Sequence, residues 1–158
     1  MDTSQESLVS FPPDKSFSLR LFNSMKYMTI SVIILTAIMY SSGSSNDTKE
    51  IALFVGLAIF LFYLAENYKW SRFYITDIIR TTNDKIKIIY YDRDVKKEFT
   101  ADVKQLSFDK RFVWYKVRSR APYLVIKKTG DGVNIEQHDV GDWDEKTMDR
   151  INSIRLYD

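Results

Sequence analysis

Acidic side chains are the residues of this sequence best suited to chemistry, and they occur in close groups. Asp92 and Asp94 lie two residues apart in a turn sequence, where solvated acids are common at the end of a sheet. Asp142, Asp144 and Glu145 precede an amphipathic segment, where acidic residues favour the start of a helix through its dipole. Structural roles account for both groups. We therefore predict no catalytic residue and a protein that is not an enzyme.

Histidine and cysteine add no further candidate. His138 is the single histidine, and Asp139 follows it, but no nucleophile lies at an informative spacing, so we expect a surface residue. The absence of cysteine excludes disulfides, thiolate metal sites and a cysteine nucleophile. Asp131 and Gly132 resemble a calcium loop only superficially, because the spacing to a bidentate glutamate is missing. We predict no metal and no cofactor.

Basic residues form the remaining candidate site. Clustered cations can hold phosphate groups, so we predict contacts to an anionic membrane surface for a group on neighbouring predicted hairpins: Arg80, Lys85, Lys87, Arg93, Lys96 and Lys97. The alternative is the solvated face of an antiparallel sheet. Nearby aspartates dilute the field and favour a general attraction over a specific headgroup pocket. A net charge of +2 is too small to indicate nucleic acid binding.

Two apolar segments before residue 70 set the architecture. They run from Lys26 to Tyr40 and from Ile51 to Tyr68, and with their flanks each approaches the roughly 20 residues that a bilayer requires. No other predicted helix is apolar enough to cover them in water. We predict a transmembrane helical hairpin over residues 26–69, with two buried helices of a soluble bundle as the alternative.

Residues at the ends of these segments support the membrane prediction. Amphipathic rings favour the headgroup zone, and those expected there are Tyr27, Tyr40, Tyr63, Tyr68 and Trp70. Ala52 and Gly56 are four residues apart, which allows a close approach of the two helices.

The basic residues that flank the hairpin predict its orientation. Arg20 and Lys26 flank its entry, and Lys69 and Arg72 flank its exit, whereas its connector carries one lysine against one aspartate and one glutamate. By the positive-inside tendency, both termini face the cytoplasm of a bacterial inner membrane. The alternative is the matrix side of the mitochondrial inner membrane.

Residues 1–25 are predicted to form a tail and an interfacial segment. Asp14 is a fair helix N-cap after Pro12-Pro13. Three apolar residues then recur at four-residue spacing, which would start a helix in the interface: Phe17, Leu21 and Met25. A frayed tail is the alternative.

Residues 70–158 alternate with a period of two and predict an antiparallel sandwich or barrel of about seven short strands. The runs are 73–80, 85–91, 95–103, 111–120, 122–128 and 133–140, with a break at Ala121-Pro122 and a strong turn at 129–132. Asp142 and Glu145 fit a capping box for a closing helix. The fold class is thus membrane α+β.

This order resembles the pleckstrin-homology-like domains of small bacterial membrane proteins with a two-helix anchor. The matching segments are Phe73–Asp77, taken as the first strand, Lys85–Tyr91, Val103–Phe108 and the closing helix with Trp143. The resemblance implies a binding or scaffolding module and no reaction. We therefore expect an accessory or assembly subunit of a larger membrane protein complex. The alternative is a membrane-tethered sensor of anionic lipid headgroups or a peptide, and a homo-oligomer is compatible with either.

Overall fold

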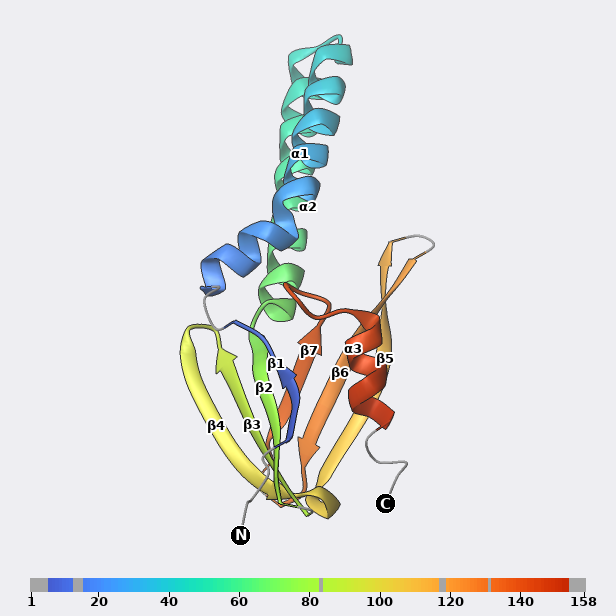
Figure 1. The fold of residues 1–158 in the computed structure, drawn as a ribbon. Coiled ribbons are helices and arrows are strands. Elements are labelled where there is room, and N and C mark those ends of the chain that lie inside the picture. The colour runs from blue at the N-terminus through green and yellow to red at the C-terminus, as the bar shows by residue number, and fades with distance from the viewer. Residues whose placement is uncertain (1–5, 13–15, 83, 117–118, 131, 154–158) are drawn as a thin grey trace. The chain divides into compact units, whose positions relative to one another are not determined.

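The computed structural model describes residues 6–12, 16–82, 84–116, 119–130 and 132–153 (Figure 1). They form two compact units, which we call the helical hairpin (residues 18–69) and the β domain (residues up to 17 and from 70 onward). The elements in chain order are β1 (Glu6–Ser10), α1 (Phe17–Ser42), α2 (Asn46–Trp70), β2 (Phe73–Thr82), β3 (Lys85–Asp92), β4 (Val95–Asp102), η1 (Val103–Gln105), β5 (Leu106–Lys116), β6 (Ser119–Lys128), β7 (Asn134–His138) and α3 (Glu145–Ser153).

Both helices of the hairpin are long and apolar enough to cross a membrane, as predicted. They contain 26 and 25 residues, and only 6% and 11% of their most apolar stretches are buried. Helix α1 begins at Phe17, so residues 17–25 are helical rather than frayed. The expected cap, Asp14, lies outside the described residues. Ser45 caps α2, because its hydroxyl accepts the N–H of Thr48 at 3.3 Å.

The predicted close approach of α1 and α2 is confirmed at Gly56. A Cβ atom added there would lie 2.2 Å from the Thr36 hydroxyl and 3.1 Å from the Thr36 Cβ, so only glycine fits. Ala52, one turn earlier, is 2% exposed. Small residues let the two backbones approach closely, as they do in many membrane helix pairs.

The β domain consists of two antiparallel sheets and α3, and no closed barrel forms. The first sheet has the order β1-β2-β3-β4 and the second has the order β5-β6-β7. The barrel alternative is therefore wrong. The predicted alternation of β3 is confirmed, because Ile86, Ile88 and Tyr90 are buried while Lys85 is exposed.

Strand β1 was missed by the sequence analysis. It pairs with β2 so that Glu6 lies opposite Arg80 and Ser10 opposite Asp77. The run from Phe73 is consequently the second strand and not the first, and the helical hairpin is inserted between β1 and β2. Only Val9 of this strand is fully buried. Five residues with one buried position give too weak a period to detect, and the partner lies 70 residues away.

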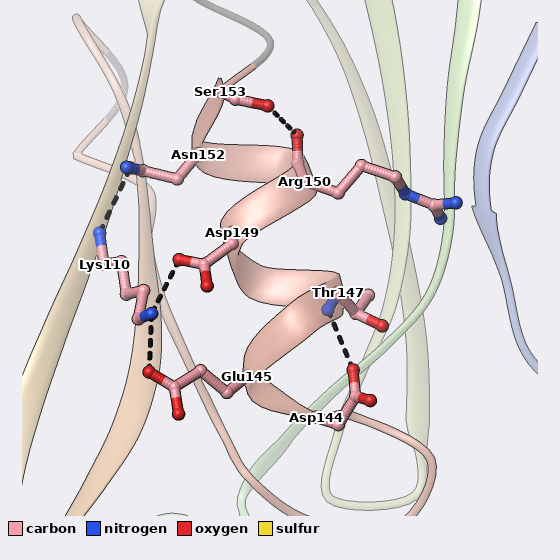
Figure 2. A network of polar contacts seen from close by, with 8 residues as sticks. All are labelled: Lys110, Asp144, Glu145, Thr147, Asp149, Arg150, Asn152 and Ser153. Carbon is pink, nitrogen blue, oxygen red and sulfur yellow. Dashed lines mark hydrogen bonds and ion pairs between the residues drawn. The ribbon is translucent and has the colours of Figure 1, made fainter.

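Two further details correct the prediction. Strand β6 runs through Ala121-Pro122 without a break, because Pro122 precedes Tyr123, the first residue that pairs with β7, and its missing N–H removes no bond on that side. The N-cap of α3 is Asp144, whose carboxylate accepts the N–H of Thr147 at 2.8 Å (Figure 2). Asp142 instead accepts the Tyr74 hydroxyl at 3.1 Å.

One polar linkage joins the two sheets and α3 inside the core. The N–H of Ile75 on β2 donates to the Gln137 side chain on β7 at 2.7 Å. The C=O of Ile75 accepts the Trp143 indole N–H, just before α3, at 2.9 Å. Both side chains are at most 1% exposed. Strand β1 ends at the pair of Ser10 with Asp77, so it cannot bond to Ile75, and the two side chains satisfy the N–H and the C=O of Ile75 in its place.

We expect Gln137→Leu to lower the free energy of unfolding by about 1–3 kcal/mol, since it leaves the buried N–H of Ile75 without an acceptor. Denaturant titration of the detergent-solubilised chain, followed by near-ultraviolet circular dichroism, measures the change. The exposed Gln105→Leu is the matched control and should change stability by no more than about 0.5 kcal/mol. Equal effects of the two substitutions would contradict the assigned role of Gln137.

Candidate functional site

The chain leaves the β domain at Phe17 and re-enters it at Trp70, and we call the end that carries these residues the junction end. The N–H of Phe17 donates to the Asp94 carboxylate at 2.7 Å. The N–H of Arg93 donates to the Arg72 carbonyl at 2.7 Å. Both crossings are therefore fixed to the β3–β4 turn. Arg93 has a φ of 59°, the left-handed conformation that this turn requires.

A three-residue ion network holds the junction end together. Arg72 donates from two guanidinium nitrogens to the Asp92 carboxylate, at 2.9 and 3.3 Å, and Lys97 donates to it at 3.0 Å. Hydrogen bonding to Arg72, helped by Lys97, lowers the pKa of Asp92 from 3.8 to about 2, although partial burial opposes the shift. The acid predicted to be merely solvated is thus a structural ion-pair partner.

His138 lies in an aromatic stack at the same end, and the expectation of a surface residue is wrong. Its ring stacks on Trp70 at 5.6 Å and on Tyr123 at 4.9 Å, with interplanar angles of 21° and 9°. The side chain is 8% exposed. Three residues so far apart in sequence share no local pattern, so only the folded chain reveals their association. The stack accounts for His138 as a packing residue.

The six predicted anionic-surface contacts do not lie together. Arg93, Lys96 and Lys97 are at the junction end, whereas Arg80, Lys85 and Lys87 lie toward the other end of β2 and β3. Lys85 and Asp92 are the two ends of β3, about 24 Å apart at the rise of a strand. Lys87 also forms an ion pair with Glu98 at 3.1 Å. The described geometry therefore gives two separated basic groups.

The predicted interface aromatics are distributed over both units. Four lie on the hairpin helices and are partly or largely exposed: Tyr27, Tyr40, Tyr63 and Tyr68. Lys26 lies over the Tyr27 ring at 4.9 Å, and Lys49 over the Tyr40 ring at 5.6 Å. Trp70 belongs to the β domain, in the stack with His138.

The hairpin itself presents a second candidate surface. An open apolar groove of about 790 Å³ runs between α1 and α2, with Val32, Thr36 and Leu53 among its lining residues. Gly56 is in the lining at the point where α2 contacts Thr36 of α1, so it forms the closed inner side of the groove. Apolar and small side chains make this a surface for hydrocarbon or for another helix.

Catalytic and metal chemistry gain no support from the structure. Within the described ranges, no three histidine, cysteine, aspartate or glutamate side chains gather where they could hold a metal ion. Asp142 accepts the Tyr74 hydroxyl and Asp144 caps α3, so both acids have structural roles. That the protein is not an enzyme stays a prediction.

No family model, no curated protein and no solved structure matches this chain. The resemblance to the pleckstrin-homology-like membrane proteins therefore stays a prediction from the sequence. Function is therefore inferred from the junction end of the β domain and from the apolar surface of the helical hairpin.

We expect Asp92→Asn to lower the free energy of unfolding by about 1 kcal/mol at pH 7, a value reduced for the screening of two partners that are almost half exposed. Because the pKa of Asp92 is lower in the folded state, its contribution is complete above about pH 4 and is lost as the pH falls toward 2. The difference between the two proteins should disappear over that interval.

Unfolding curves recorded between pH 7 and pH 2 measure this convergence. Glu136→Gln, which changes an exposed carboxylate on β7, is the control and should differ from the parent by no more than about 0.5 kcal/mol at every pH. A constant gap between Asp92→Asn and the parent down to pH 2 would rule out the ion network as its cause.

Proposed function

We propose that this protein is a non-catalytic, membrane-anchored interaction module that serves as an accessory or assembly subunit of a larger membrane protein complex. The observation that carries the proposal is the uncovered apolar surface of both long helices. Large side chains are more than half exposed all along them, including Ile33, Ile38, Phe54 and Phe62. Leaving this area in water is unfavourable, since burial of apolar surface contributes about 25 cal/mol per Å². A bilayer with partner helices removes the cost.

The helical groove favours a subunit role over a simple tether. A tether requires only two apolar helices, whereas the groove between α1 and α2 is a recess that a third helix can enter. The seven strands and the closing helix are the features on which the resemblance to scaffolding modules rests. The insertion of the hairpin after the first strand departs from the order expected from that resemblance.

Short connections at both crossings hold the β domain at the membrane surface. Ser71 and Arg72 alone separate α2 from β2, and six residues separate β1 from α1. Two tethers restrict rotation more than one would. The basic residues around the crossings support a β domain on the cytoplasmic side, or on the matrix side of a mitochondrial membrane. The cations Arg93, Lys96 and Lys97 near the crossings support a lipid-headgroup sensor as the second candidate function.

Mild detergent extraction from its native membrane, followed by native gel electrophoresis, tests the subunit role. We expect the protein to migrate with a complex much larger than its 18.6 kDa chain. Ala37→Leu should release it from that complex by filling the groove, because Ala37 is an exposed residue of the groove lining. Ala58→Leu, at an exposed position of α2 outside the lining, should not. Migration of the parent protein as a monomer or small homo-oligomer would refute the accessory role and leave the sensor.

Single introduced cysteines test the orientation, because the chain has none of its own. Ser44→Cys lies in the connector of the hairpin and Lys127→Cys on β6. In sealed cells or mitoplasts, an impermeant maleimide should label position 44 only, and permeabilisation should make position 127 reactive. The reverse pattern would invert the proposed topology. Labelling of both positions before permeabilisation would exclude a membrane-spanning hairpin.

A further inference from the structure

We propose that the outer part of the β5–β6 hairpin is a second membrane contact, which inserts Phe112 and Trp114 into the headgroup region of an anionic bilayer. The inference rests on the proposed membrane anchoring. It names the surface by which the β domain engages the lipid. No part of the predicted set of basic residues on β2, β3 and β4 contributes to it.

One face of β5 passes from the core to full exposure along its length. Alternate residues share a face of a strand, and along this one Leu106 is 1% exposed, Phe108 7%, Phe112 50% and Trp114 65%. Lys110 lies on this face between Phe108 and Phe112, and it binds Glu145 and Asp149 of α3 at 2.8 and 2.6 Å (Figure 2). Helix α3 thus covers the face as far as Lys110, and among the described residues the aromatic side chains beyond it remain half exposed or more.

This uncovered part extends from the junction end. Tyr123 pairs with Arg111 on one side and with His138 on the other, and His138 stacks on Trp70. Strand β7 ends at His138, so β5 and β6 continue as a two-stranded ribbon (Figure 1). Trp114 lies about 10 Å beyond Arg111 at the rise of a strand. The ribbon therefore extends beyond Tyr123, the residue that connects it through His138 to Trp70, where the chain leaves α2.

The charges of the ribbon suit an anionic surface. Residues 110–123 contain five basic residues and no acidic residue. The Arg120 guanidinium lies 4.7 Å from the centre of the Trp114 ring. Lys110 is engaged by Glu145 and Asp149 and Arg111 by Asp109 at 2.7 Å, so Arg120 is the cation that we assign to the lipid phosphate. Rings next to cations are the side chains that favour the headgroup zone, where the ring meets hydrocarbon and the cation meets phosphate. An aromatic ring that favours hydrocarbon beside a cation that favours phosphate fits an anionic bilayer, and we assign the bilayer as the partner of this surface.

Fluorescence of the full-length protein in lipid nanodiscs tests the inference. The discs contain phosphatidylglycerol and phosphatidylcholine with brominated acyl chains, which quench nearby tryptophan. Subtracting the signal of Trp114→Phe isolates Trp114 from Trp70 and Trp143. We expect the Trp114 component to be quenched and shifted to the blue. Arg120→Glu should reverse most of the quenching, as should discs of phosphatidylcholine alone. Lys127→Glu, a charge reversal at the other end of β6, should leave it unchanged.

The outcomes separate this inference from the proposed anchoring. Incorporation of the chain into discs with an unquenched, solvent-exposed Trp114 overturns the second contact and leaves the anchor intact. Failure to incorporate overturns both. If Trp114 is unquenched and Trp114→Ser releases a co-purifying protein, the ribbon is a protein interface and the inference is wrong. Equal quenching of the parent and Arg120→Glu in anionic discs would exclude the electrostatic part of the proposal.

Discussion

The backbone of Ile75 is the constraint on which the β domain depends. Strand β2 extends past the end of β1, so a buried N–H and C=O would lose their partners at this residue. Gln137 and Trp143 supply them from the second sheet and from the approach to α3. Two sheets without a continuous ladder are thereby locked at a fixed offset. The hydrophobic core is non-directional, and this polar linkage specifies how its layers are placed.

The contacts of β1 explain how a helical hairpin can be inserted between two paired strands. β1 lies at the edge of its sheet, and its bulge near Leu8 leaves a carbonyl that accepts a hydrogen bond from Arg150 of α3. The edge is therefore held by the C-terminal helix as well as by β2. Because β1 is fixed from both sides, the chain can depart at Phe17 and return at Trp70 without loosening the sheet.

Local sequence patterns predicted those elements whose stability is local. Charge-free runs identified both long helices, alternation identified β3, and Gly130 with Gly132 identified the turn before β7, although Asp131 lies outside the described residues. The patterns failed where a distant partner decides the outcome. Strand β1 is defined by its pairing with β2. The predicted cap of α3, Asp142, instead accepts the hydroxyl of Tyr74 on β2, and Asp144 caps the helix. The basic residues were grouped by sequence proximity, but the length of β3 separates them.

Several independent contacts hold the junction end of the β domain in one conformation. Asp92 ties Arg72 to Lys97, the β3–β4 turn holds both crossings, and the stack around His138 links the second sheet to Trp70. These contacts make the crossing residues Phe17 and Trp70 part of the folded β domain. The exposed aromatics of β5 lie on a strand that pairs with Tyr123, which stacks on His138, so the contacts that hold the crossing residue Trp70 continue into the ribbon that carries Phe112 and Trp114.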